Sequence, residues 1–290
     1  MPPARLYDCF PFFCELDLLE IRLAEMAPHI HRFVLVEAEW DFSGNPKPLY
    51  YAENAERFRA YHDKIIHIPL RERAPNEGER WARQRWQRDQ IRRGLGEAAP
   101  DDLILISDLD EIPNAEALSE ARNRLASQRA VVVFRMRQHE YGLDLRHQTQ
   151  HPACSRMVRL RDLRVPHLVR QIKFRYWKSA DERLDQIPAR YHAIFACGRP
   201  LPRITLEEAG WHLTYMGDLD FAKRKISACF EDEKIDLADN LLLRRAKEVD
   251  QNSLPDQLEP VPLSALPGAI ARDPARYSHL FFDQNFGADA

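Results

Sequence analysis

Short apolar runs alternate with amphipathic stretches along the first 136 residues of the chain. The apolar runs, each bounded by polar or turn-forming residues, predict strands over residues 5–10, 32–37, 64–68, 103–107 and 130–136. Apolar positions that recur every three or four residues predict helices over 15–26, 79–95 and 115–126. Strands that alternate with helices are typical of an α/β fold with a mostly parallel central sheet flanked by helices.

Beyond residue 140 the pattern is weaker. Short apolar pieces predict strands at 157–160, 172–177 and 211–216, followed by a helix over 220–233. Prolines are dense between residues 252 and 268, which favours an extended arm on the surface. The stretch from 276 to 282 is too apolar for a free tail, and we expect it to dock onto the rest of the chain.

Composition narrows the class of protein. The chain has 290 residues, 44% of them hydrophobic, which is enough to build a large core. Its net charge of −3 gives no overall positive charge that would attract nucleic acid. Its five cysteines are scattered without zinc-ligand spacing, which favours a reducing compartment. No apolar run is long enough for a transmembrane segment and the start does not look like a signal peptide, so a cytoplasmic location is expected.

An acidic turn follows the apolar run Leu103–Ile106. Asp108 and Asp110 lie one residue apart where this strand ends, and Glu111 comes next. Ligands bind at the carboxyl ends of strands in open α/β sheets, and two carboxylates there form a hard oxygen site for Mn²⁺ or Mg²⁺ that also binds phosphate. We expect Asp110 to bind the metal directly, Asp108 to bind metal or ribose, and Glu111 to orient the ligands. The alternative is a solvated turn whose acids cap the next helix.

Two further residues are candidates for donor binding. Arg88 is predicted on the same helical stripe as Trp81, Ile91 and Leu95, and a charge on an inward stripe needs a partner. That partner is either a diphosphate or a structural carboxylate. Glu37 ends the second strand, where an acid can bind ribose hydroxyls or simply cap a helix.

The later part of the chain offers a third metal ligand and a base. His212 could bind metal or phosphate, although a histidine in an apolar segment is often a hydrogen-bonded core residue. Asp220 and Glu233 are candidates for a general base, with a solvated helix face as the alternative. Neither a dinucleotide-binding glycine motif nor a P-loop is present.

Several blocks together resemble glycosyltransferase family 17, which includes the bisecting N-acetylglucosaminyltransferase. The matching blocks are residues 15–23, 33–37 with 44–49, Trp81 with Arg88, 101–113, and Gly210-Trp211-His212 followed by Lys225. This resemblance implies a GT-A-like, Rossmann-related nucleotide-diphospho-sugar transferase fold. It also implies a UDP-sugar donor, in particular UDP-N-acetylglucosamine, with Mn²⁺ and inversion at the anomeric carbon. Asp108 and Asp110 correspond to the family's Asp-x-Asp pair.

These points predict a metal-dependent inverting glycosyltransferase in a single domain. We expect residues 1–112 to form a nucleotide-binding half, 113–250 an acceptor half and 251–290 an extended arm. We expect no N-terminal membrane anchor of the family's kind, which favours a bacterial glycan or glycolipid acceptor over a Golgi N-glycan. The alternatives are a metal-dependent nucleotidyltransferase or sugar-nucleotide hydrolase, and an inactive carbohydrate-binding protein.

Overall fold

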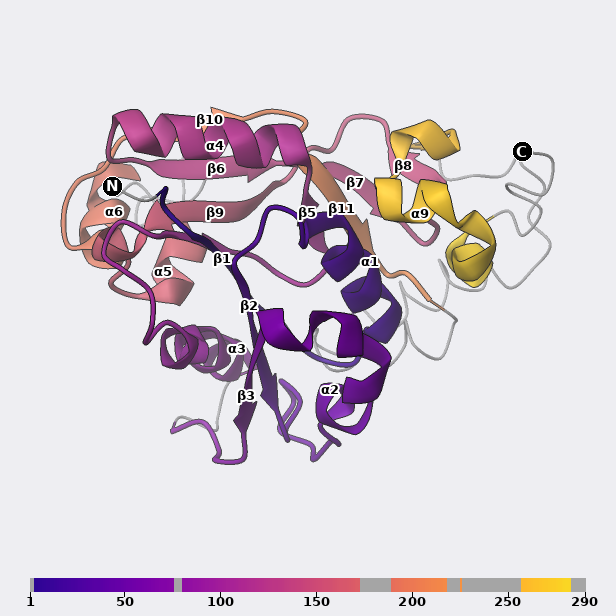
Figure 1. The fold of residues 1–290 in the computed structure, drawn as a ribbon, viewed down its shortest axis with the longest axis horizontal. Coiled ribbons are helices and arrows are strands. Elements are labelled where there is room, and N and C mark those ends of the chain that lie inside the picture. Colours follow the sequence, from indigo (N-terminus) through magenta and orange to yellow (C-terminus); the bar gives the residue numbers. More distant parts are fainter. Residues whose placement is uncertain (1–2, 76–79, 173–188, 218–224, 226–256, 283–290) are drawn as a thin grey trace, which may run out of the picture.

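The computed structural model describes residues 3–75, 80–172, 189–217, 225 and 257–282 (Figure 1). Within these residues a seven-stranded sheet has the order β10-β6-β9-β4-β1-β2-β3. β9 runs antiparallel to both of its neighbours, and every other neighbouring pair is parallel. The predicted α/β fold with a mostly parallel sheet is therefore confirmed. The strands are β1 (Leu6–Phe12), β2 (Arg32–Ala38), β3 (Ile65–Leu70), β4 (Leu103–Ile106), β6 (Val131–Arg135), β9 (Ala153–Arg159) and β10 (Arg203–Leu206).

Both faces of this sheet are buried, which explains the continuous apolar runs. On β1, Leu6 and Phe10 point into one hydrophobic cluster, whereas Tyr7 and Cys9 point into a second cluster on the opposite face. The first cluster includes residues of α1 (Leu16–Met26) and α4 (Ala115–Ser127). The second is covered by a 3-10 segment, η2 (Gln90–Gly94), and by α5 (Pro166–Arg170) and α6 (Ala189–Cys197). Helices on both faces shield a parallel sheet from water.

A second, smaller sheet has the strand order β12-β8-β7-β11-β5. β5 (Glu111–Pro113) begins inside the acidic turn and pairs antiparallel with β11 (Gly210–Thr214). β11 in turn runs parallel to β7 (Arg137–Glu140). The acidic turn therefore joins the end of β4 in the main sheet to the edge strand of the second sheet.

Gly210 makes this junction possible. It has a φ of +140°, and a Cβ atom at this position would lie 2.1 Å from the carbonyl oxygen of Ile112. Any side chain at residue 210 would therefore push β11 away from β5. This contact accounts for the glycine in the Gly-Trp-His block.

The C-terminal part contributes regular structure where the sequence indicated an extended arm. β12 (Leu258–Pro260) pairs with β8 (Leu145–His147), and α9 (Gly268–Arg272) contacts α1. For residues 257–268, the prediction of an extended surface arm was wrong, because Val261 and Leu266 are buried in the core. The docking of residues 276–282 is confirmed. Short helical segments complete the described part: α2 (Tyr50–Glu53), η1 (Ala55–Lys64), η3 (Leu160–Asp162), η6 (Leu263–Ala265) and η7 (Pro274–Leu280).

The structure differs from the predicted helix over 79–95 in two respects, the conformation of its second half and the residues that face the core. The described α-helix is α3 (Arg80–Asp89), and η2 follows it as a 3-10 segment. Arg88 and Ile91 are buried, but Trp81 is 55% exposed, so its placement on an inward core stripe was wrong. Trp81, in the first turn of α3, instead lines a pocket at the surface. The predicted strand at 172–177 and helix at 220–233 fall almost entirely outside the described residues.

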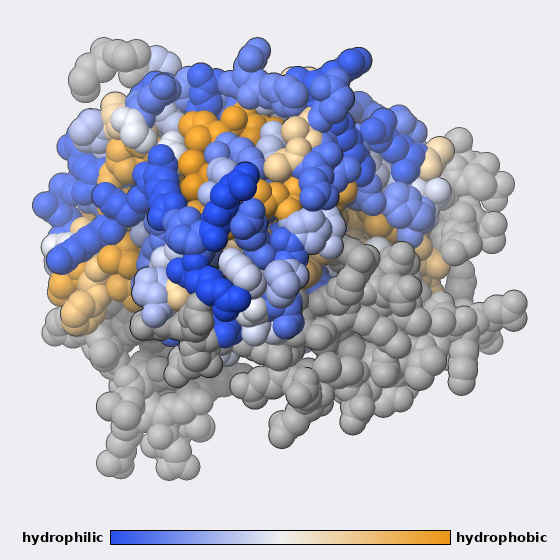
Figure 2. All heavy atoms as spheres, turned by 90° about the horizontal axis from the view of Figure 1, so that it is seen from below, coloured by the Kyte–Doolittle hydropathy of each residue, from blue (hydrophilic) through white to orange (hydrophobic). Residues whose placement is uncertain are grey.

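The surface is mixed in polarity. On the face seen from below, hydrophilic residues cover much of the described surface, with smaller apolar areas between them (Figure 2). Among the described helices, none has the length and apolar character that crossing a lipid bilayer requires. The division into nucleotide-binding and acceptor halves stays a prediction.

Candidate active site

A pocket of about 370 Å³ lies where the two sheets meet. Its volume falls within the range of roughly 300–1,000 Å³ that is usual for small-molecule sites. The main sheet contributes residues that follow β1 and β4, among them Phe13, Asp108 and Asp110. The second sheet contributes the polar side chains Gln138, Glu140, His212 and Thr214.

A buried arginine holds the acidic turn in place. Arg22, on α1, is fully buried and forms an ion pair with Asp8 of β1, with 2.6 Å between its Nη2 and Asp8 Oδ1. Its Nη1 donates to the carbonyl oxygens of Asp108 (3.1 Å), Leu109 (3.0 Å) and Glu111 (2.5 Å). One side chain thus fixes three carbonyl groups of the turn and orients the carboxylates that project from it.

Asp8 and Arg22 were not among the predicted site residues, although the sequence contains a signal for their pairing. Asp8 interrupts an apolar strand, and Arg22 interrupts the apolar stripe of α1. Two opposite charges at buried positions are expected to pair, because an unpaired buried charge is strongly destabilising. Their link to the acidic turn becomes visible only once β1 and β4 are seen to be neighbours.

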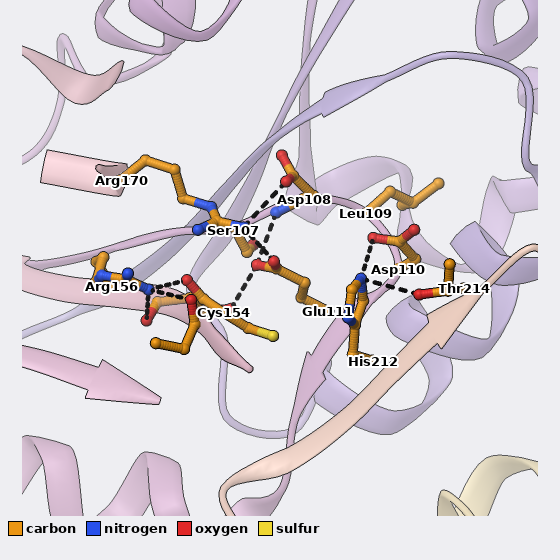
Figure 3. A network of polar contacts seen from close by, with 12 residues as sticks. Ser107, Asp108, Leu109, Asp110, Glu111, Cys154, Arg156, Arg170, His212 and Thr214 are labelled. Carbon is orange, nitrogen blue, oxygen red and sulfur yellow. Dashed lines mark hydrogen bonds and ion pairs between the residues drawn. The ribbon is translucent and has the colours of Figure 1, made fainter. Parts of the chain in front are cut away.

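Asp108 is bound by two arginines. Its Oδ1 pairs with Arg88 and its Oδ2 lies 3.1 Å from Nη2 of Arg170 (Figure 3). Burial alone would raise the pKa of Asp108, but the two guanidinium groups outweigh it and lower this pKa strongly. Arg170 also pairs with Glu111, which is 1% exposed and accepts a hydrogen bond from the backbone N–H of Asp108 (3.1 Å). Glu111 is therefore positioned to orient Asp108 and Arg170.

Asp110 faces a different set of groups. Its Oδ2 lies 2.7 Å from Nζ of Lys225, and its Oδ1 lies 3.7 Å from Nε2 of His212. Nε2 of His212 is also 3.2 Å from Oγ1 of Thr214 (Figure 3). Burial would raise the pKa of Asp110, but Lys225 and His212 outweigh this effect and lower it. Asp110 is consequently ionised at neutral pH.

The pocket wall from the second sheet is a polar face set by strand alternation. β7 and β11 are parallel and in register, so His212 lies beside Gln138 and Thr214 lies beside Glu140. The intervening His139 and Leu213 are fully buried on the opposite side. The result is a polar face of four side chains that lines the pocket beside the acidic turn.

Aromatic side chains line another part of the pocket. Phe42 comes from the loop after β2, whereas Trp81 belongs to the first turn of α3. Nη1 of Arg83 donates to the carbonyl oxygen of Phe42 (2.8 Å), which ties this loop to α3. An aromatic side chain that is 55% exposed at the border of a pocket offers a flat surface on which a ring can stack.

The other predicted site residues are not all brought together. Glu37 is fully buried away from the pocket lining, where its carboxylate accepts from the Tyr51 backbone N–H (2.9 Å) and lies 3.0 Å from Nε2 of His67. Arg88 has the structural carboxylate partner that was one of its two predicted alternatives. Asp220 and Glu233 lie outside the described residues.

A larger cavity of about 810 Å³ lies at the opposite edge of the main sheet. It is lined by residues near the amino ends of β1 and β4, including Arg5, Asp101 and Asp102. Asp102 is bound there by Arg5, with 2.7 Å between Oδ2 and Nη2, and Asp101 pairs with two arginines. We assign the candidate site to the smaller pocket, because it combines the carboxyl ends of the parallel strands with the acidic turn.

The chain belongs to glycosyltransferase family 17, whose family model matches residues 1–159. Among curated proteins, it is 29% identical over 119 residues to the beta-1,4-mannosyl-glycoprotein 4-beta-N-acetylglucosaminyltransferase of Rattus norvegicus. The Homo sapiens protein of the same name gives the same identity. Each match covers 38% of this chain and only 22% of the relative's length.

Two solved structures overlap with most of the chain at low sequence identity. A 4-diphosphocytidyl-2C-methyl-D-erythritol synthase from Anaerococcus prevotii is 11% identical with a TM-score of 0.40, covering 83% of this chain and 97% of that one. A putative nucleotide-diphospho-sugar transferase from Desulfovibrio desulfuricans is 13% identical with a TM-score of 0.37, covering 83% and 98%.

Proposed function

We propose that this protein is a metal-dependent inverting glycosyltransferase that moves N-acetylglucosamine from UDP-N-acetylglucosamine to a hydroxyl group of a glycan or glycolipid. The observation that carries the proposal is the position of Asp108 and Asp110, at the carboxyl end of β4 and in a pocket, in a member of glycosyltransferase family 17. The donor sugar is taken from the names of the relatives, which are N-acetylglucosaminyltransferases.

The residues present fit a divalent metal ion. Asp110 offers an ionised carboxylate and His212 an imidazole nitrogen, a ligand set that suits Mn²⁺, and Mg²⁺ is the alternative. No group of three His, Cys, Asp or Glu side chains among the described residues is arranged to hold a metal alone. That is compatible with ions of this kind, which bind through one or two protein ligands plus substrate phosphates. When bound, the metal supplies positive charge for the departing diphosphate.

Cationic side chains next to the acidic turn complete the proposed donor site. Lys225 lines the pocket and binds Asp110, whereas Arg88 and Arg170 lie outside the pocket lining and bind Asp108 and Glu111. A diphosphate that enters the pocket can share Lys225 with Asp110, while the two arginines hold Asp108 in place. Charge-assisted hydrogen bonds to the diphosphate become stronger as the sugar–phosphate bond breaks, which favours release of UDP.

Inversion follows from direct displacement. The donor carries its sugar in an α linkage, and the relatives form β linkages, as their names state. One displacement at the anomeric carbon converts α into β. The acceptor hydroxyl must therefore approach from the side of the sugar opposite the diphosphate, and the polar face of the second sheet is the candidate wall for that approach.

Isothermal titration calorimetry with UDP-N-acetylglucosamine, with and without Mn²⁺, tests the proposal. We expect binding of UDP-N-acetylglucosamine that depends on Mn²⁺, and release of UDP when an acceptor is present. The Asp110→Asn variant should release UDP at least about 100-fold more slowly, because the substitution removes the charged metal ligand. Glu120→Gln, an exposed residue on α4, is the matched control. Release of pyrophosphate instead of UDP would identify a nucleotidyltransferase, and absence of nucleotide binding would favour an inactive carbohydrate-binding protein.

A further inference from the structure

Among the described residues, four carboxylates line the pocket, and three of them form ion pairs with cationic side chains. Asp108 pairs with two arginines, and Lys225 lies between Asp110 (2.7 Å) and Glu15 (3.1 Å). Oxygen atoms of these three carboxylates are therefore already in contact with cationic side chains. This geometry suits them to electrostatic roles rather than to contact with an acceptor hydroxyl group.

Glu140 is the fourth carboxylate, and its surroundings differ. Within the described part of the chain it forms no ion pair, and its hydrogen-bond partner is the neutral amide of Gln138, whose Nε2 donates to Oε1. An amide of this kind orients the carboxylate without neutralising its charge. Its second oxygen, Oε2, has no hydrogen-bond partner among the described residues and is available to a molecule in the pocket.

The backbone fixes Glu140 at the end of its strand. Glu140 is the last residue of β7, and the next residue, Tyr141, has a φ of +65°. The Tyr141 backbone N–H donates to the carbonyl oxygen of Thr214 (3.1 Å), and its ring stacks on that of Tyr215, with 5.8 Å between the ring centroids. Tyr215 also has a positive φ, +57°. Left-handed conformations of this kind are unfavourable for residues other than glycine and persist where surrounding contacts impose them, commonly at functional sites.

From this geometry we propose that Glu140 is the general base that activates the acceptor hydroxyl group. The inference rests on the proposed function and adds a catalytic residue to it. In the reaction, the acceptor oxygen forms a bond to the anomeric carbon while the bond from that carbon to the UDP oxygen breaks. UDP leaves with the electron pair, and the hydroxyl proton passes to the Glu140 carboxylate and then to solvent. Glu140 replaces Asp220 and Glu233 as the preferred base.

The test compares a nucleophile that must lose a proton with one that need not. Water attacks UDP-N-acetylglucosamine only as its proton is removed, whereas azide is already an anion. We expect Glu140→Gln to lower UDP release in water by about 10²- to 10⁴-fold, the usual contribution of a general base. Azide should restore UDP release in this variant and yield the glycosyl azide, which mass spectrometry detects. In calorimetry, the Glu140→Gln variant should bind UDP in the presence of Mn²⁺ with the same affinity as the unaltered protein.

Two control variants keep the test independent of misfolding. Glu207→Gln changes an exposed glutamate outside the pocket and should leave both reactions unchanged. Glu140→Asp retains a carboxylate and should keep part of the water reaction.

Several results would overturn the assignment. Glu140→Gln with full activity in water would exclude the base role, and equal loss of the water and azide reactions would assign Glu140 to donor binding instead. A selective loss of the water reaction in Asp220→Asn or Glu233→Gln would place the base there. If the unaltered protein binds UDP-N-acetylglucosamine and releases UDP, these outcomes concern Glu140 alone. An unaltered protein that neither binds nor cleaves sugar nucleotides refutes the proposed function and the base assignment with it.

Discussion

Nζ of Lys225 lies 2.7 Å from Oδ2 of Asp110, so an ammonium group neutralises the carboxylate to which the proposed metal binds. The same ammonium lies 3.1 Å from Oε1 of Glu15 and thereby links the acidic turn to the residue that precedes α1. Two cations cannot share one carboxylate oxygen without repulsion. Lys225 must therefore move, or share Asp110, when a metal ion binds.

This relationship predicts that Lys225→Met raises the affinity for Mn²⁺ in the absence of nucleotide by roughly tenfold, because a competing charge is removed. Calorimetry with Mn²⁺ alone measures the effect. Asp110→Asn in the same background should abolish the gain, since the carboxylate that both cations use is lost. Unchanged or weaker Mn²⁺ binding in Lys225→Met would show that the lysine does not compete with the metal.

Breaking the buried ion pair between Asp8 and Arg22 should strongly lower the stability of the protein. Arg22→Met leaves the Asp8 carboxylate buried without its cation and three carbonyl groups of the acidic turn without their donor. We expect a loss of about 3–5 kcal/mol in the free energy of unfolding, the usual cost of breaking a buried ion pair from one side. Urea denaturation followed by circular dichroism measures it.

The double variant Asp8→Asn with Arg22→Met is the control for charge. It removes the uncompensated carboxylate, so it should recover part of the lost stability. A single variant that unfolds at the same urea concentration as the unaltered protein would contradict the proposed contribution of the pair.

His139 predicts how stability depends on pH. Burial lowers the pKa of His139 to about 4, from 6.5 in an exposed chain, and its Nδ1 lies 2.8 Å from the carbonyl oxygen of Leu143. Between these two pKa values the unfolded chain binds a proton that the folded protein does not, so stability falls as the pH decreases through this window. The expected loss between pH 7 and pH 5 is about 2 kcal/mol.

His139→Gln isolates this effect, because glutamine does not titrate. The free energy of unfolding of the variant should depend less on pH between 5 and 7 than that of the unaltered protein. His31, whose pKa burial also lowers, contributes equally to both proteins and cancels in the comparison. Identical pH dependence in the two proteins would show that the pKa of His139 is the same in the folded and the unfolded protein, which would contradict the prediction.

Trp81 predicts an effect on binding with little effect on stability. Because its side chain is 55% exposed, Trp81→Ala should change the free energy of unfolding by no more than about 0.5 kcal/mol. Loss of a stacking surface should raise the KM for UDP-N-acetylglucosamine or for the acceptor by roughly tenfold, in line with stacking energies of about 1–3 kcal/mol. Steady-state kinetics measures the change.

Phe195 provides a matched comparison, since it is 62% exposed and lies outside the pocket lining. Phe195→Ala should leave KM unchanged. Equal effects of the two substitutions would mean that Trp81 has no direct contact with a substrate.

The sequence was informative where burial imposes a simple pattern. Strands covered on both faces must be continuously apolar, so Leu103–Ile106 and the acidic turn after it were predicted in place. The second sheet was harder, because β7 and β8 have only four and three residues and carry polar side chains. The pocket position of Glu140 depends on the pairing of β7 with β11, a contact between distant segments that no local pattern encodes.

Because Arg22 holds the backbone of the acidic turn against the middle of α1, we expect the docking of this helix and the assembly of the proposed donor pocket to be one cooperative event. A molecule whose first helix has detached would retain Asp108 and Asp110 but lose the geometry that makes them useful. Partly unfolded chains should therefore not bind nucleotides, so that nucleotide binding measures whether the N-terminal core is intact.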